Sequence, residues 1–464
     1  MATTKFNSII VASALSAAGA AFLTAPAMSG DPCGDNSGFD VTTVFVAENG
    51  YGGGGSDIDY YGTSGGVRGF AVGTTSCNRG NQTAPWYGGT NNVPVIQQSC
   101  YRILDGRFEQ IGMSWLKHSF CAVSEPGCNT WTGGGCNSTN CNTLGIGCAD
   151  TYWAGLNADA DAPRSEINAT TGHYDYPFTI SPSGSSSVRG KLQLVDADYL
   201  NVDGASFFME AQYVERNEHE QCDGQRHLNN ASHCKALFNS ATSCVRDQSW
   251  GPTKHMVPAI FSWEDVGATV RQLDTDEADS VPGRMNVGWL VTDNGNGTWH
   301  YEYAIHNQNS HRSFDSFSIP VPASTTLTNV EFRDIHYHSS EQNVIHGTDW
   351  TFSNAGGNAT WTAVDEGSAT NAIRWATTYN FRFDANAAPE GVQVSLDYWR
   401  SGGSDSSVGF TGQGPGSGST NCPGDFNGDN TVDVEDVLTV IEGWGTDYQV
   451  EDLLEVLAMY GTSC

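Results

Sequence analysis

The sequence predicts a mainly β fold, in which a disulfide-containing β-rich region and a β-sandwich precede a small all-α module at the C-terminus. Three observations favour this class. Short runs of Val, Ile, Thr, Tyr and Phe are separated by clusters of Gly, Asn and Ser, which is the pattern of strands joined by turns. The chain contains 54 glycines and 13 tryptophans. Helical periodicity is scarce until the last residues of the chain.

The chain begins with the features of a signal peptide, which we place at residues 1–27. Lys5 precedes an apolar run from Ile9 to Leu23, and Ala25-Pro-Ala27 supplies the small residues that a signal peptidase reads. No other stretch of the sequence approaches the length of a membrane span. The sequence therefore predicts a secreted protein, either extracellular or at the cell surface, with no membrane span.

Residues 28–284 are predicted to form the β-rich secreted region. Its strand-like runs are Val41–Val46, Val67–Val72, Arg107–Trp115, Lys191–Val195 and Ser206–Val214. The loops between these runs are long, and long loops in a compact secreted domain are often where function lies.

The chain contains 13 cysteines, which in an exported protein indicate a disulfide framework. A dense set lies between residues 121 and 148, namely Cys121, Cys128, Cys136, Cys141 and Cys148. A zinc site is the alternative, but these spacings do not form a pair of CxxC units, so we expect bridges. We also expect Cys422 to pair with Cys464. Because the remaining number is odd, at least one cysteine must be free, metal-bound or intermolecular.

Residues 285–400 are predicted to form a separate β-sandwich of about eight strands. The strand-like runs are Asn286–Thr292, Thr298–Asn307, Ser316–Val321, Asn329–His338, Asp349–Ser353, Ala359–Val364, Ile373–Phe383 and Val392–Trp399. The segments Asp293–Gly297 and Asn354–Gly357 are strong hairpin signals. Residues 401–421, rich in Gly and Ser, are predicted to be a flexible linker.

The composition is strongly acidic, which limits the classes of partner. The chain has 52 acidic and 21 basic residues, a net charge of −31, and only five of the basic residues are lysines. Nucleic acids and anionic membranes require a basic surface, so the sequence predicts neither as a partner.

Residues 422–464 contain a twelve-residue stretch, Asp425 to Asp436, with the spacing of a calcium loop of the EF-hand type. Such a loop requires oxygen ligands at positions 1, 3, 5, 7, 9 and 12. The residues at these positions are Asp425, Asn427, Asp429, Thr431 through its carbonyl, Asp433 and Asp436. The alternative is an acidic turn that binds no metal, but six correctly spaced donors before an apolar helix favour calcium.

This segment resembles a type I dockerin module, in which a calcium loop leads into a helix and the unit is repeated. The stretch from Asp436 to Thr446 is echoed by the stretch from Asp452 to Thr462, and both carry apolar residues at helical spacing. The second unit lacks a calcium loop. Val434 and Glu435 stand where cellulosomal dockerins carry a hydroxyl pair. The resemblance implies one calcium site and a possible cohesin-like or cell-surface partner.

The body of the chain resembles a set of large secreted proteins from planctomycete-type bacteria that have no assigned activity. The resemblance is carried by the segments Gly73–Asn78, Gly106–His118, Trp299–Ser310 and Tyr379–Pro389. It implies an architecture and a source, and it implies no chemistry.

Two kinds of catalytic site are compatible with the residues of the body. Glu109, Glu166, Glu210 and Glu302 lie in or beside aromatic runs, and two facing carboxylates could act as acid and base on a glycosidic bond. The second is a metal site, because alternation places several histidines and acids on one face of two predicted strands. Its candidates are His300, Glu302, His306, Asp334, His336 and His338, with His311, Glu341 and His346 in nearby loops. The alternative is that these polar residues lie on the solvated face of the sandwich, opposite Tyr301, Tyr303 and Ile305.

The aromatic residues suggest a third function, the binding of carbohydrate. Some of them could form a platform that stacks on sugar rings, while most are expected in the core. The candidates are Trp86, Tyr87, Trp115, Trp131, Trp153, Trp350, Trp361, Trp375 and Trp399.

The sequence as a whole favours a secreted modular protein that acts in polysaccharide breakdown and carries a calcium-binding tail. The resemblance to dockerins implies hydrolysis of O-glycosyl bonds, because such modules usually follow glycoside-cleaving enzymes. The first alternative is a non-catalytic attachment or carbohydrate-binding protein. The second is a metal-dependent oxidoreductase or lyase built on the histidines.

Overall fold

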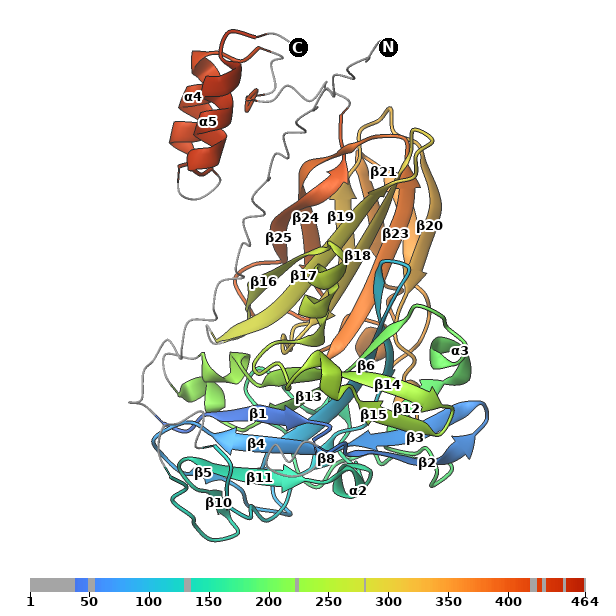
Figure 1. Cartoon of the computed structure of the whole chain (residues 1–464), viewed down its shortest axis with the longest axis vertical. Coiled ribbons are helices and arrows are strands. Elements are labelled where there is room, and N and C mark those ends of the chain that lie inside the picture. The colour runs from blue at the N-terminus through green and yellow to red at the C-terminus, as the bar shows by residue number, and fades with distance from the viewer. Residues whose placement is uncertain are drawn as a thin grey trace, which may run out of the picture.

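The computed structural model describes residues 38–48, 55–128, 135–221, 225–278, 281–417, 424–427, 431–444 and 448–462. These residues form a mainly β protein of several sheets, which confirms the mainly β part of the predicted class (Figure 1). The predicted signal peptide and the predicted pair Cys422 and Cys464 lie outside the described residues.

The first region is built on a nine-stranded antiparallel sheet. Its order is β15-β14-β13-β6-β7-β12-β3-β2, and β8 pairs with β6. The strands are β2 (Ile58–Ser64), β3 (Val67–Val72), β6 (Val95–Leu104), β7 (Arg107–Met113), β8 (Lys117–His118), β12 (Leu192–Val195), β13 (Ser206–Val214), β14 (Ala231–Ser240) and β15 (Ser243–Arg246). The predicted strands of this region are confirmed, with small differences at their ends.

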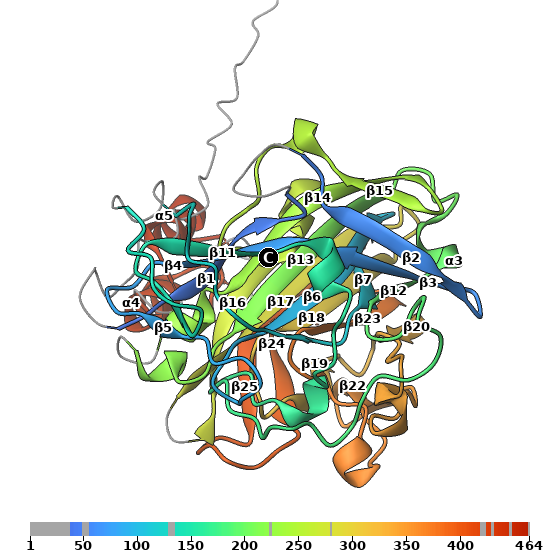
Figure 2. The ribbon, with the colours of Figure 1, turned by 90° about the horizontal axis from the view of Figure 1, so that it is seen from below.

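Two smaller sheets complete the first region. One has the order β1-β4-β11-β9, and the other pairs β10 with β5. Their strands are β1 (Val41–Val46), β4 (Thr74–Asn78), β5 (Ala84–Pro85), β9 (Glu125–Pro126), β10 (Thr143–Leu144) and β11 (Cys148–Tyr152). Seen from below, these strands lie on one side of the region, and β2 and β3 lie on the other (Figure 2).

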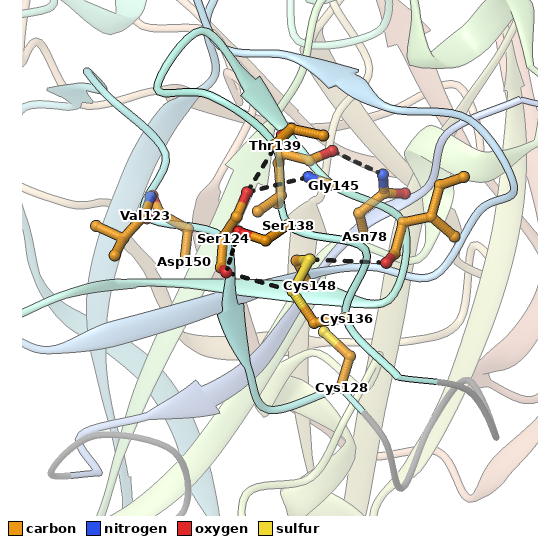
Figure 3. Close-up of a disulfide and its surroundings, with 12 residues drawn as sticks. Asn78, Val123, Ser124, Cys128, Cys136, Ser138, Thr139, Gly145, Cys148 and Asp150 are labelled. Carbon is orange, nitrogen blue, oxygen red and sulfur yellow. Dashed lines mark hydrogen bonds between the residues drawn. A yellow bond between two sulfur atoms is a disulfide. The ribbon is translucent and has the colours of Figure 1, made fainter.

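Among the described residues, three disulfides cross-link the loops around the smaller sheets. They join Cys77 to Cys128, Cys121 to Cys141, and Cys136 to Cys148. Figure 3 shows the last of them beside Ser124. The dense cysteine set therefore forms bridges, as predicted, and all five of its members are used. In a segment with few strand residues, such bridges add stability by restricting the unfolded chain.

Three further cysteines, Cys100, Cys234 and Cys244, are free and buried. They lie in one apolar cluster around Met209, whose backbone pairs with Cys100 on one side and with Cys234 on the other. Burial raises the pKa of all three thiols, that of Cys234 to about 12.

We expect these three thiols to resist iodoacetamide in the native protein and to react fully in denaturant, because the reactive species is the thiolate. Mass mapping of alkylated peptides checks this. Labelling of Cys234 in the native state at neutral pH would contradict the packing.

The second region is a sandwich of two five-stranded antiparallel sheets, with orders β16-β17-β18-β23-β20 and β21-β22-β19-β24-β25. The strands are β16 (Thr269–Asp276), β17 (Pro282–Asp293), β18 (Trp299–Asn307), β19 (Phe314–Pro320), β20 (Leu327–Arg333), β21 (Thr351–Ala355), β22 (Asn358–Thr362), β23 (Thr377–Ala385), β24 (Pro389–Tyr398) and β25 (Ser407–Pro415). Side chains of both sheets, among them Tyr303, Phe317, Trp361 and Phe381, meet in one core.

All eight strands predicted for the sandwich are present, but the sandwich is longer at both ends than the predicted bounds 285–400. It gains β16 from the range assigned to the first region. Strand β25 runs through the range 401–421 that was predicted to be a linker, where it pairs with β24 along its whole length. Glycine-rich sequence concealed this strand, because Gly409, Gly412 and Gly414 allow close packing but lower β propensity.

The predicted hairpin turns are confirmed. Between β17 and β18, Asp293 accepts a hydrogen bond from the Gly295 nitrogen at 2.7 Å, and Gly295 has a φ of 73°. Between β21 and β22, Gly356 and Gly357 have φ of 64° and 82°. Positive φ at both central residues is what a tight two-residue hairpin demands, and glycine adopts it without steric cost.

Helices are short in the part of the body that the structure describes. They are α2 (Ala154–Asn157) and α3 (Asp196–Tyr199), with 3₁₀ segments η2 (Arg164–Glu166), η3 (Glu218–Glu220), η5 (Arg226–Leu228), η6 (Gln248–Trp250), η7 (Ala259–Val266), η9 (Glu341–Asn343) and η10 (Gly367–Ala369). Two longer helices, α4 (Val434–Glu442) and α5 (Val450–Met459), follow near the C-terminus and share a small core of Val432, Val440 and Val456. Among the described helices, none is long and apolar enough to cross a membrane.

Candidate functional site

The two regions meet at a buried ionic network rather than at a cleft with free acids. Glu109 on β7 contacts Arg102 at 2.5 Å and Arg382 at 2.9 Å, and Arg333 lies 3.7 Å away. Burial alone would raise the pKa of Glu109, but these three guanidinium groups lower it to about 2. Glu109 is therefore ionised and fully paired.

Glu302 on β18 belongs to the same network. Arg382 lies 3.0 Å from its carboxylate, His300 3.4 Å and Arg107 3.5 Å. Burial raises the pKa of Glu302, and hydrogen bonding to His300 opposes the rise. A single guanidinium, that of Arg382, thus bridges Glu109 and Glu302. Two acids joined in this way hold strands of the two regions together and do not face each other across an open cleft.

The other two candidate acids, Glu210 and Glu166, also have structural roles. Glu210 is fully buried, and it accepts hydrogen bonds from the Ala259 nitrogen at 2.7 Å and from the Tyr101 hydroxyl at 3.2 Å. Burial raises its pKa to about 7. Glu166 accepts hydrogen bonds from the nitrogens of Thr179 and Ile180, which fixes the turn there.

The predicted histidine set is divided among different contacts. His300 contacts Asp384 at 2.7 Å and Glu302 at 3.4 Å. His306 is buried beside the Thr378 hydroxyl at 3.0 Å, and burial lowers its pKa to about 3. Glu302 and His306 are each 1% exposed, so this part of the face of β18 is not solvated, which corrects the alternative expectation, whereas the His300 side chain is 24% exposed. The buried part is covered because β7 packs against β23 and η7 against β17.

His336 and His338 follow the end of β20 instead of continuing it, so they do not alternate along a strand as predicted. Their rings lie 5.8 Å apart, and burial together with His336 lowers the pKa of His338 to about 4. The remaining candidates lie elsewhere: Asp334 accepts a hydrogen bond from Asn371, Glu341 lies 3.7 Å from Arg164, and His346 lies 3.7 Å from Glu366. Within the described ranges, no group of three or more His, Cys, Asp or Glu side chains is placed to hold a metal ion.

The predicted calcium loop is described except for residues 428–430, which include Asp429. Asp436 is buried at the start of α4, where its Oδ1 accepts hydrogen bonds from the nitrogens of Phe426 at 2.7 Å and Asn427 at 3.0 Å. Its Oδ2 accepts one from the Asp433 nitrogen at 2.8 Å. Burial opposes ionisation, but these hydrogen bonds outweigh it and lower the pKa of Asp436.

This arrangement fits a calcium ligand set. The Asp436 carboxylate draws the beginning and the end of the loop together. Among the described residues, its Oδ2 accepts a hydrogen bond from the Asp433 nitrogen alone, so this oxygen keeps a lone pair for a metal ion. Asp433 caps α4 through the Glu435 nitrogen at 2.8 Å. The six-ligand assignment of Asp425, Asn427, Asp429, Thr431, Asp433 and Asp436 stays a prediction.

A groove on the first region gathers cations and aromatic rings that the sequence reasoning missed. Its hollow measures about 630 Å³ and is lined by Lys117, Ala158, Asp159, Ala160, Asp161, Ser181, Pro182, Ser186, Arg189 and Lys191. Lys117 donates to the Asp159 carbonyl at 3.1 Å, and Lys191 donates to the Ala158 carbonyl at 3.3 Å. The sequence signal that could have indicated this groove is the scarcity of lysine, since two of the only five lysines in the chain line it.

Aromatic side chains flank this groove. The Lys117 ammonium lies 5.4 Å from the Phe120 ring centre, and the Lys191 ammonium lies 5.1 Å from that of Tyr61. Trp153, which precedes α2, is 46% exposed, and Tyr176 stacks on His118, the neighbour of Lys117 in sequence. We call Tyr61, Lys117, Phe120 and Lys191 the aromatic groove.

The other predicted aromatics divide as expected between core and surface. Trp86, Trp115, Trp350, Trp361 and Trp375 are buried, Tyr87 is exposed, Trp399 is half-buried, and Trp131 lies outside the described residues.

No protein-family model matches the sequence, and no curated protein matches it either. Among solved structures, the chain is similar to the KRT10-binding region domain of the pneumococcal serine-rich repeat protein PsrP. The match has 13% identity and a TM-score of 0.18, and it covers 31% of this chain and 98% of that one.

Proposed function

We propose that this chain is an extracellular polysaccharide-binding protein that holds glycan in the aromatic groove. The observation that supports the proposal is the hollow of about 630 Å³ lined by Lys117 and Lys191, whose ammonium groups lie against the rings of Phe120 and Tyr61. Aromatic faces pack against the apolar faces of sugar rings, and fixed polar groups bind their hydroxyls. The groove offers ammonium groups, serine hydroxyls and the carboxylates of Asp159 and Asp161 as such partners.

Binding is preferred to hydrolysis because of the contacts of the acids. Glu109 and Glu302 share Arg382, and Glu210 and Glu166 hold backbone nitrogens. A glycosidase needs two carboxylates free to exchange protons or to attack the sugar. We also propose that a signal peptide directs the export of the chain and that its tail binds calcium. The tail would attach the protein to a cohesin-like or cell-surface partner.

Phe120→Ala should weaken binding of the full chain to its polysaccharide about tenfold, because one stacking face is lost. Phe120 is exposed, so the free energy of unfolding should change little. Affinity electrophoresis across a panel of neutral and acidic polysaccharides identifies the ligand and measures the loss.

Phe352→Ala is the matched control, since Phe352 is an exposed aromatic on β21 of the sandwich. Equal effects of the two substitutions, or no binding of polysaccharide by the wild type, would contradict the proposal that the aromatic groove is the binding site. The same samples are assayed for released reducing sugar, and release would establish hydrolysis instead of binding alone.

A further inference from the structure

A second hollow, also of about 630 Å³, lies at the end of β24 and presents two arginines. It is lined by Ser165, Val344, Gly367, Ser368, Arg374, Trp399, Arg400 and Ser401. Both guanidinium groups lie over the Trp399 ring, with Arg374 at 4.3 Å and Arg400 at 4.2 Å from its centre. We call this the Arg374–Arg400 pocket.

Neither arginine is neutralised by a contacting acid. Arg374 is 3% exposed and donates to the carbonyls of Ser368 and Thr370 at 3.0 Å, while its Nε is buried without a partner. Arg400 donates to the His311 carbonyl and, at 3.5 Å, to the Ser313 hydroxyl. Across the described ranges, neither guanidinium has a carboxylate within 4.0 Å.

Two acids act electrostatically on these arginines, Glu341 on Arg374 and Glu277 on Arg400, and both are engaged with other groups. Glu341 lies 3.7 Å from Arg164 and accepts a hydrogen bond from the Ser165 nitrogen at 3.2 Å. Glu277 accepts hydrogen bonds from the Thr275 hydroxyl at 2.8 Å and the Arg312 nitrogen at 3.0 Å. Burial and the neighbouring Arg374 lower the pKa of Arg400 to about 10. Burial, Arg400 and Arg374 lower the pKa of His311 to about 4. Burial is the larger cause of both pKa shifts, and the neighbouring guanidinium groups add to it.

Two like charges that lie close together and partly buried cost free energy, unless an anion binds between them and compensates their charge. The chain as a whole carries a net charge of −31, so a generally basic surface does not explain why two arginines lie together here. The same net charge repels polyanions at long range, whereas a small ligand with one anionic group meets mainly the local field.

We infer that the Arg374–Arg400 pocket binds a single oxyanion group, a carboxylate or sulfate, carried by a sugar or present as a free anion. Guanidinium groups match the paired oxygens of these anions, and the hydroxyls of Ser165, Ser368 and Ser401 line the same hollow as further donors. The inference does not rest on the aromatic groove, which shares no lining residue with this pocket.

Calorimetric titration of the full chain tests the inference with glucuronate, glucose 6-sulfate, inorganic sulfate and glucose as probes. Saturable binding of at least one anionic probe, and none of glucose, is expected. Tighter binding of the sugar anions than of inorganic sulfate identifies the sugar-borne source, and the reverse order identifies the free anion. Arg400→Gln should weaken the binding at least about tenfold. Unchanged affinity in this variant, or equal binding of glucose and glucuronate, would overturn the inference.

A second variant keeps the test independent of any folding defect in Arg400→Gln. Ser401→Glu places a carboxylate at the rim of the pocket, where it should occupy the site, abolish anion binding and raise the melting temperature. Ser406→Glu adds the same charge at an exposed position outside the lining and should leave binding unchanged. Equal anion affinity in the two variants would exclude the pocket as the site.

Discussion

Replacing Arg382 with Ala is expected to destabilise the body by about 3–5 kcal/mol, because it leaves two buried acids without their shared partner. Arg382 is 5% exposed and contacts Glu109 at 2.9 Å and Glu302 at 3.0 Å. The two acids are themselves 3% and 1% exposed. Urea unfolding of the full chain, followed by tryptophan fluorescence, measures the change in the free energy of unfolding.

Arg107→Ala is the matched control. Arg107 lies 3.5 Å from the same Glu302, but its side chain is 37% exposed, so its loss should cost less than about 1 kcal/mol. Adding Glu109→Gln and Glu302→Gln to the Arg382 variant should recover part of the stability, because neutral amides are less costly to bury than carboxylates. Equal losses in the Arg382 and Arg107 variants would show that the network does not hold the two regions together.

The difference in the free energy of unfolding between the wild type and Arg382→Ala should depend on pH in a defined direction. The pKa of Glu109 falls from an ordinary 4.5 to about 2 in the folded protein. Its contribution to stability is therefore fully present above about pH 4.5 and is lost as the pH falls toward 2. The gap between wild type and Arg382→Ala should narrow over this window.

The sequence predicted strands well because alternation is a local signal. Tyr301, Tyr303 and Ile305 were expected to face the core of the sandwich, and all three are fully buried. The disulfides were predicted as a class, but their pairing was not, since pairing depends on where the loops meet in space. Strand β25 was missed because glycines and serines outweigh the apolar residues in it.

The candidate sites were harder to predict because they depend on which polar residues meet. Glu109 and Arg382 are far apart in sequence, and only the packing of β7 against β23 makes them neighbours. The same packing buries Glu302 and His306, which alternation alone would place in solvent. Arg374 and Arg400 are likewise brought together by the fold around Trp399, a residue that the sequence suggested only as a possible sugar platform.

The calcium loop is the one site whose ligands can be named from sequence spacing, and its removal is the second large effect that we expect. Asp425→Ala should abolish one calcium-binding event of the full chain, because the first ligand of the loop is lost. Calcium at a hundredfold excess over its Kd would stabilise the wild-type tail by about 2.7 kcal/mol, and the variant should lose this gain. Calorimetric titration with calcium and melting curves with and without calcium measure both effects.

Asp436→Ala should have a further effect that does not depend on calcium. Its carboxylate accepts hydrogen bonds from Phe426, Asn427 and Asp433, so its loss leaves three loop nitrogens without this partner. Asp452→Ala is the matched control, because Asp452 accepts the equivalent hydrogen bond from the nitrogen of Gln449, which precedes α5, at 2.6 Å and lies outside the loop. The tail should lose stability in both variants without calcium, but only Asp436→Ala should also lose the calcium response. If Asp425→Ala and Asp436→Ala bind calcium as the wild type does, the loop is an acidic turn and the tail is held by its helices alone.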